Sequence, residues 1–325
     1  MTKDSGFQVP SSMRPTRERV GLVVDGTNAA AAVKTIAAAE AAGVRQIWMV
    51  QSPWSPDILT TLAAAAAKTS TIRLGTSIVP TYPRHPLVMA QQAWSLYDIA
   101  PGRLRLGIGP SHQSIIECIY GLPQTTPLAH LREYVNVLRT VLWEGKVDHH
   151  GQFFNVKVTF PHTSHIPVLI STLGKKAFQL AGEIADGALS FMCPVPYLIR
   201  TAIPTMHAAA AAVGRSAPPL VAHVSVALSQ DRDSVLAVGH QLFDMYGKFP
   251  FYAKMFADAG FPLTASQMIS DSLIDSLIVS GNEDTVAAQF TKLLTGGLDE
   301  LYVGLVPIID ADNEQSRLVN LIGQL

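Results

Sequence analysis

The sequence predicts a (β/α)8 barrel, the TIM-barrel fold of the α/β class, with an insertion after the fourth strand. Eight short, strongly apolar runs alternate with stretches of helical periodicity along the 325 residues. Nearly continuous apolar runs are typical of strands that are buried on both faces of a parallel sheet. No Pro/Ser-rich linker or run of charge divides the chain. We therefore expect an N-terminal tail over residues 1–18 and a single barrel domain over residues 19–325.

The first four strand–helix units follow one another without interruption. An alanine-rich helix ends at Gly43, a residue type that can adopt the left-handed C-terminal cap. Asp57 stands at a capping position before the second helix, and Pro86 stands in the first turn of the third. The expected strands are 19–26, 46–51, 72–80 and 103–109, and the expected helices are 29–42, 58–68, 86–99 and 127–144.

The pattern changes after residue 144. Residues 151–160 alternate between polar and apolar like a small hairpin, so we expect an insertion at about 145–165 outside the main sheet. The stretch 234–270 carries an aromatic cluster, which either fills the core or walls an apolar substrate pocket. The remaining expected strands are 166–171, 187–192, 220–228 and 300–306, and the remaining helices are 175–184, 197–213 and 283–294.

Composition argues against several classes of function. A formal net charge of −1 gives no long-range field for nucleic acid or an anionic membrane surface, so we expect neither partner. Cys118 and Cys193 are too few for a disulfide framework and are expected to be reduced thiols. The N-terminal residues lack the apolar segment of a secretory signal, and no apolar run approaches the length of a membrane span. We therefore expect a cytoplasmic protein.

Polar residues gather where the strands end, which is where barrel enzymes place their active sites. Ser77 and Tyr82 follow the third strand, and Ser111 and His112 follow the fourth. A histidine there can donate a hydrogen bond or a proton near neutral pH, although a structural role is equally open. Residues 171–176 join a buried strand to a helix through Gly174, which suits either an anion site or an ordinary helix cap.

Metal-dependent hydrolysis is not favoured by the sequence. The first strand ends in Val23-Val-Asp-Gly rather than in the paired histidines that such barrel hydrolases need. The adjacent His149 and His150 would face opposite sides of a strand. No metal site is therefore predicted.

Five segments give the chain a family likeness. With them, the sequence resembles the bacterial luciferase-like monooxygenase superfamily, and more closely its actinobacterial coenzyme F420-dependent oxidoreductases. The likeness covers about residues 19–307. Its segments are Val79-Pro-Thr-Tyr-Pro-Arg-His-Pro, Gly102-Arg-Leu-Arg-Leu-Gly-Ile-Gly-Pro-Ser-His-Gln, Ala129-His-Leu-Arg-Glu-Tyr, Gly182-Glu-Ile-Ala-Asp-Gly and Tyr246-Gly-Lys-Phe-Pro-Phe-Tyr.

The resemblance implies a barrel of the bacterial luciferase-like type that holds a deazaflavin or flavin over the end of the third strand. It implies a cis peptide bond between Ser77 and Ile78 against the ring system. It also implies that Ser111 and His112 approach the ring, and that His130 lies near the phosphate. Phosphate-binding amides would come from Thr172, Leu173, Gly174 and Lys175.

The end of the second strand departs from the family pattern. Many F420-dependent relatives have an acidic residue followed by histidine there, whereas this chain has Gln51-Ser52-Pro53. We keep Gln51 as a cofactor contact. The departure disfavours alcohol or sugar-phosphate oxidation, in which a base takes the hydroxyl proton. Reduction of a small organic acceptor fits better.

The resulting hypothesis is an F420-dependent oxidoreductase that reduces an activated C=C or C=N bond of a small-molecule substrate. His112 is the expected hydrogen-bonding or acid residue, with Tyr82 or Tyr246 as the alternative. A second hypothesis is an FMN-dependent monooxygenase that uses dioxygen and a separate flavin reductase. A third is a barrel that only stores or senses the cofactor. Relatives are commonly homodimers, which we expect here as well.

Overall fold

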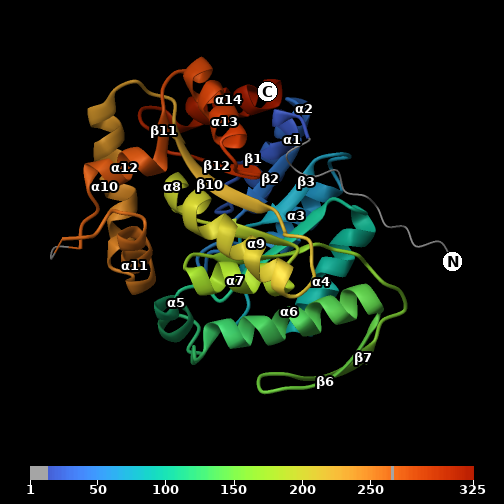
Figure 1. Ribbon diagram of the computed structural model, residues 1–325. Coiled ribbons are helices and arrows are strands. Elements are labelled where there is room, and N and C mark those ends of the chain that lie inside the picture. Colours follow the sequence, from blue (N-terminus) through green and yellow to red (C-terminus); the bar gives the residue numbers. More distant parts are fainter. Residues whose placement is uncertain (1–13, 265–266) are drawn as a thin grey trace.

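Eight parallel strands form a closed ring in the computed structural model, which describes residues 14–264 and 267–325 (Figure 1). Each strand pairs with the next strand of the ring along the chain, and the last pairs with the first. The predicted barrel is therefore confirmed. Its strands are β1 (Val20–Val23), β2 (Gln46–Met49), β3 (Arg73–Thr76), β5 (Leu104–Gly109), β8 (Val168–Thr172), β9 (Gly187–Ser190), β10 (Leu220–Ala227) and β12 (Glu300–Leu305).

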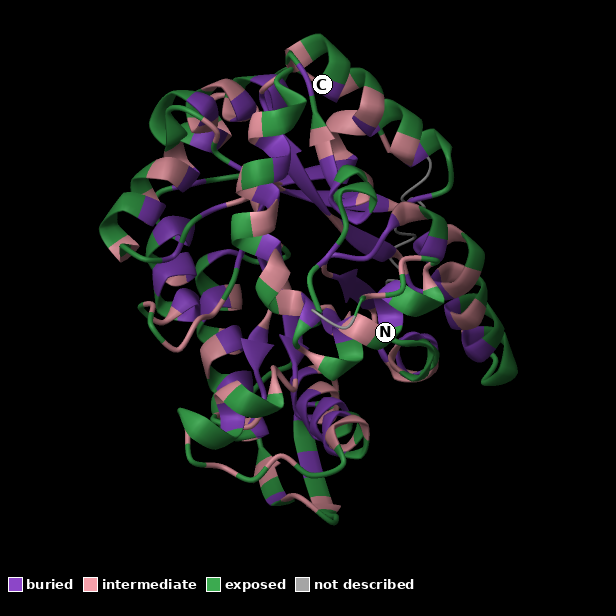
Figure 2. Cartoon of the chain, turned by 90° about the vertical axis from the view of Figure 1, so that its left-hand side faces the viewer, coloured by how far each residue is buried: buried purple, intermediate pink, exposed green. Residues whose placement is uncertain are grey.

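Helices surround this ring with their apolar faces turned inward, so that buried residues concentrate at the strands (Figure 2). Asn28 and Asp57 cap α2 and α3 by accepting hydrogen bonds from the N–H groups of Ala31 and Thr60. The helices after the strands are α2 (Ala29–Ala41), α3 (Ile58–Ala66), α4 (Pro86–Ile99), α6 (Pro127–Glu144), α7 (Lys175–Ile184), α9 (Ile203–Ala212), α13 (Glu283–Thr295) and α14 (Ala311–Gln324). Among these helices of the described residues, none is long and apolar enough to cross a membrane.

Shorter elements complete the chain. The aromatic stretch after β10 folds into α10 (Arg232–Gly247) and α11 (Pro250–Asp258), which lie together at one side of the barrel in Figure 1. The other short elements are α1 (Thr16–Arg19), β4 (Val79–Pro80), α5 (Gln113–Cys118), α8 (Val195–Tyr197) with a π-helical turn at Leu198–Ala202, α12 (Asp271–Leu277) and β11 (Ile278–Ser280).

The insertion after the fourth barrel strand is a two-stranded hairpin that lies within the expected range 145–165. Strand β6 (Lys146–His150) pairs with β7 (Asn155–Thr159), so the hairpin begins before the alternating stretch 151–160 and its turn lies at 151–154. A carboxylate on α6 fixes this turn, because Glu133 accepts hydrogen bonds from the N–H groups of Phe153 and Phe154. A contact between helix and turn leaves no mark in local alternation.

The barrel interior is packed around one tryptophan. The Trp48 indole fills the space left by Gly21 and Gly75, where a side chain would collide with it. Beneath it, the Arg105 guanidinium lies 5.0 Å from the indole centroid and pairs with Glu300 at 2.6 Å. Since Glu300 is 1% exposed, this ion pair closes the amino-terminal end of the barrel. Chemistry is thus confined to the carboxyl ends of the strands.

Candidate active site

The segment after β3 forms one edge of the carboxyl-terminal face of the barrel. The Ser77–Ile78 peptide bond is cis, as the resemblance implies. Backbone hydrogen bonds tie this segment to both neighbouring strands: Ser77 N–H donates to the Met49 carbonyl, and Thr81 N–H donates to the Gly109 carbonyl. The backbone of residues 77–82 is therefore held beside the ends of β2 and β5.

Three buried polar atoms at this edge have no hydrogen-bond partner among the described residues. They are the Ser77 hydroxyl, the Thr81 hydroxyl and Nδ1 of His130. The three side chains are 9%, 1% and 6% exposed. Buried polar groups are nearly always paired, and an unpaired one costs on the order of 1–3 kcal/mol. Their donors and acceptors are available to a polar ligand.

His130 is held as a neutral ring beside these hydroxyls. It comes from the first turn of α6 and stacks on Tyr82, with the ring centroids 4.0 Å apart and the planes 9° from parallel. Burial lowers the pKa of His130 to about 4, although Glu133 acts in the opposite direction. The Tyr82 hydroxyl donates to the Thr125 carbonyl at 2.8 Å. Tyr82 therefore packs against the His130 ring, and the proton of the Tyr82 hydroxyl is already used in a hydrogen bond.

The start of α7 offers an uncapped helix N-terminus at the end of β8. Gly174 is its N-cap residue, supplies no side-chain hydrogen bond and has open space where a side chain would stand. Free N–H groups and the helix dipole favour an anion at such an end. The Thr172 hydroxyl donates to the Leu189 carbonyl inside the sheet, and the expected role of its backbone amide stays a prediction. Leu173 and the exposed Lys175 flank the glycine.

Gln51 uses its side chain within its own loop. Its amide nitrogen donates to the Ser52 carbonyl at 2.8 Å, and its amide oxygen accepts from the N–H of Ile58 at 3.0 Å. Its backbone N–H donates to the Ile78 carbonyl at 3.3 Å. Gln51 thus links the loop that begins α3 to the segment after β3, and these bonds occupy both ends of its amide.

Ser111 and His112 lie where β5 passes into α5. Ser111 has a φ of 62°, in the left-handed region that non-glycine residues rarely adopt. The Gln124 side chain donates to the Pro110 carbonyl at 2.7 Å and to the Ser111 carbonyl at 3.4 Å, which holds this turn. The half-buried His112 ring makes no hydrogen bond with any described residue. Burial lowers the pKa of His112, so the ring is neutral at pH 7 and can donate one N–H.

Ser171 belongs to the segment 171–176 identified from the sequence, whereas sequence reasoning missed two further residues of this face, Phe191 and His223. The Ser171 hydroxyl lies against Gly109, and any side chain at residue 109 would collide with it. The half-buried rings of Phe191 and His223 lie 4.5 Å apart on neighbouring strands. Burial lowers the pKa of His223 to about 3. Alternation along each strand could have found them, because every second residue of a barrel strand points inward.

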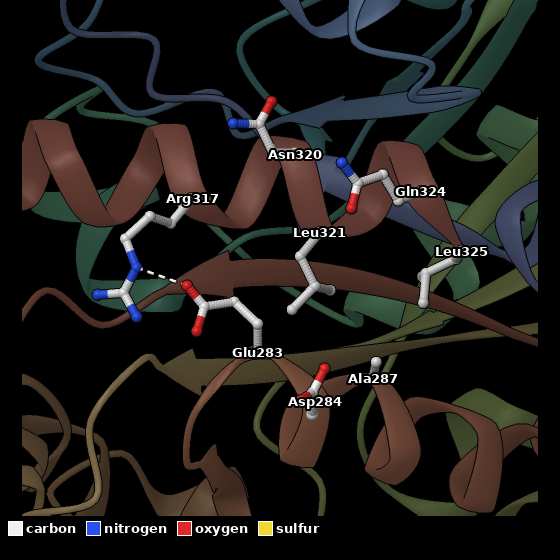
Figure 3. Close-up of a pocket in the computed structure, with 8 residues that line it drawn as sticks. All are labelled: Glu283, Asp284, Ala287, Arg317, Asn320, Leu321, Gln324 and Leu325. Atoms are coloured by element: carbon white, nitrogen blue, oxygen red, sulfur yellow. Dashed lines mark hydrogen bonds and ion pairs between the residues drawn. The ribbon is translucent and has the colours of Figure 1, made fainter.

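A separate hollow of about 340 Å³ lies on the outer layer of the barrel, between α13 and α14 (Figure 3). An ion pair between Arg317 and Glu283, with Nε and Oε1 2.6 Å apart, spans one end of it. None of its lining residues is a candidate identified above. It is formed by helix surfaces rather than by strand ends, so the catalytic candidates are not assigned to it.

Comparisons with known proteins agree with this geometry. The family model for luciferase-like monooxygenases matches residues 11–300. The chain is 25% identical to 5,10-methylenetetrahydromethanopterin reductase of Methanolobus tindarius, covering 88% of this chain and 92% of the relative. It is 26% identical to a Mycobacterium tuberculosis protein with the provisional name coenzyme F420-dependent oxidoreductase, covering 82% and 88%.

A solved structure shows the same fold. The F420-dependent tetrahydromethanopterin reductase of Methanopyrus kandleri superposes with a TM-score of 0.75 at 22% identity, covering 94% of this chain and 97% of that one. The chain is therefore an oxidoreductase that belongs to the luciferase-like monooxygenase family.

Proposed function

We propose that this enzyme uses coenzyme F420 to reduce an activated C=C or C=N bond of a small organic molecule. The observation that carries the proposal is the set of buried polar atoms on Ser77, Thr81 and His130 that have no partner among the described residues, together with the uncapped start of α7 at the end of β8. Such a set suits a cofactor that has polar groups along its length and an anionic group at one end. The names of the relatives favour F420.

In this proposal, different residues bind the phosphate, bind the rest of the cofactor and donate a hydrogen bond to the substrate. The Gly174 end of α7 would hold the phosphate, while Ser77 and Thr81 would bind polar groups nearer the ring system. F420 in its reduced form, when bound, would supply the hydride. His112 would donate a hydrogen bond to the acceptor atom on which negative charge develops, because its pKa keeps the ring neutral and one N–H in place.

The Thr81→Val variant tests the cofactor site. Valine keeps the shape of threonine and removes a hydroxyl that has no partner, so the ligand-free protein should melt at the same temperature or higher. The dissociation constant for F420, measured by quenching of tryptophan fluorescence, should rise by about 3-fold to 100-fold, as expected for one lost hydrogen bond.

The control is Thr76→Val. The Thr76 hydroxyl donates to the Gly107 carbonyl and accepts from the Gly107 N–H, so its loss should lower the melting temperature. The proposal fails if Thr81→Val lowers the melting temperature like this control and leaves F420 affinity unchanged.

The family description as monooxygenases favours one alternative, an FMN-dependent enzyme that uses dioxygen. A parallel titration with FMN separates the two. Preference for FMN, with oxygen consumption in the presence of a flavin reductase, would replace the F420 proposal. We extend the proposal to a homodimer, the state that the sequence resemblance implies, and a monomer mass in sedimentation equilibrium would remove that part.

A further inference from the structure

His112 lacks the polar contact that usually fixes a functional histidine. Catalytic histidines are commonly oriented by a hydrogen bond to one ring nitrogen, which also selects the tautomer. Neither nitrogen of His112 has such a bond with a described residue. Its ring is nevertheless confined, because the Phe249 ring lies parallel to it at a centroid distance of 4.5 Å and an angle of 5°. An aromatic face takes the place of a hydrogen-bond partner.

Phe249 is itself fixed by α10 and α11. It is the N-cap residue of α11, and its N–H donates to the Tyr246 carbonyl at 3.1 Å. Its carbonyl accepts from the N–H of Tyr252 at 3.0 Å. The Tyr252 ring is 7% exposed and lies 6.0 Å from that of the fully buried Phe256. The plane that contacts His112 is thus connected to the packed interior of this helix pair.

We propose that Phe249 is a positioning residue for His112, holding the plane of the imidazole so that its N–H faces the reacting part of the substrate. The proposal rests on the function proposed above and adds a residue from a remote part of the chain. Figure 1 shows α5, which His112 precedes, beside α11, in agreement with the ring contact. A partial rotation of the imidazole about either side-chain bond would tilt its plane and lose the parallel contact with Phe249.

Three variants test whether His112 needs the flat ring of Phe249 or only its apolar volume. Phe249→Leu keeps an apolar side chain without a flat face, and Phe249→Tyr keeps the face. Phe251→Ala is the control, because this ring on the same helix is 70% exposed. With reduced F420 and 2-cyclohexen-1-one as the probe acceptor, Phe249→Leu should lower kcat by about 10-fold to 100-fold. Phe249→Tyr and Phe251→Ala should stay within twofold of the parent, and F420 affinity should not change.

A double-variant cycle tests whether Phe249 acts through His112. In a His112→Ala background, Phe249→Leu should have no further effect on kcat, because the group that it positions is gone. An equal loss of kcat in both backgrounds would overturn the proposal. So would a Phe249→Leu variant that is as active as Phe251→Ala.

Nuclear magnetic resonance gives a readout that does not depend on turnover. In a sample with labelled histidine, the ring protons of His112 should carry an upfield shift from the Phe249 face, which disappears in Phe249→Leu. The pKa of His112 should then rise toward its ordinary value as water reaches the ring. If no acceptor is reduced but these changes occur, the proposed reaction fails and the positioning contact stands. If the ring protons and the pKa are the same in both proteins, the positioning role is refuted.

Discussion

The contact between Trp48 and Gly75 inside the barrel yields a quantitative prediction. A methyl group at residue 75 would come within 2.6 Å of three indole ring carbons. The indole cannot withdraw, because Gly21 adjoins it on another strand, the Arg105 guanidinium lies 5.0 Å away and the Tyr302 ring lies 5.8 Å away. Overpacking of this kind costs about 1–3 kcal/mol, and a rigid neighbour favours the upper half of that range.

The backbone offsets part of this cost. Alanine reduces the entropy of the unfolded chain relative to glycine, which returns about 0.4–1 kcal/mol. We therefore expect Gly75→Ala to lower the free energy of unfolding by about 2 kcal/mol. With an unfolding entropy of about 2.1 cal/mol/K per residue, this corresponds to a fall in melting temperature of about 3 °C. Differential scanning calorimetry measures it directly.

Trp48→Leu provides the partner variant and Gly26→Ala the control. Removing the indole frees the space, so Gly75→Ala should be neutral or stabilising in that background, with a coupling energy of about 2 kcal/mol. A methyl group at residue 26 meets only the end of the flexible Met49 side chain, at 3.3 Å, and should change stability by less than about 0.5 kcal/mol. A 3 °C loss that persists without the indole would refute the packing argument.

Two further predictions concern buried charge and pH. Glu300→Gln should cost about 3–5 kcal/mol, measured by calorimetry, because Arg105 keeps its charge inside the barrel and loses its anionic partner; replacing both residues by apolar ones should recover most of the loss. The folded pKa values of His130 and His223, about 4 and about 3, lie below the unfolded value of 6.5, so only the unfolded state takes up these protons as pH falls. Stability should therefore drop by a few kcal/mol between pH 6.5 and pH 4.5, before the carboxylates titrate, and replacing both histidines with glutamine should flatten this drop in melting temperature.

Local patterns were sufficient to predict the barrel because each strand and most helices carry their own signals. Apolar runs marked the eight strands, and residues such as Asp57 marked helix starts through bonds that span three residues. One turn that depends on a distant partner was not located by the pattern, and one helix with a local cap was overlooked. The hairpin turn depends on Glu133, and α14, which begins with Asp310 accepting from the N–H of Asn313, follows a strand after which no helix was expected.

The sequence indicated which residues follow the strands more reliably than it indicated where their side chains point. Ser77 and His112 were expected to follow the third and fourth strands, and they follow β3 and β5, whereas the expected place of His130 near a phosphate stays a prediction. The side chains of Gln51 and Thr172 make hydrogen bonds to backbone groups of their own loop and of the neighbouring strand. Which face of the sheet a hydroxyl meets depends on strand register, and register is a tertiary property.

The electrostatics of the face also depend on burial, which no local pattern reports. The side chains of His112, His223 and Tyr246 share one condition: burial shifts each pKa in the direction that keeps the group uncharged at pH 7. The side near Phe249 therefore offers hydrogen-bond donors without fixed charge, while the start of α7 supplies the positive potential for an anion. A neutral donor gains little from a neutral acceptor and more from one that becomes negative during hydride transfer. Such a face would favour the transition state of the proposed reduction over its ground state.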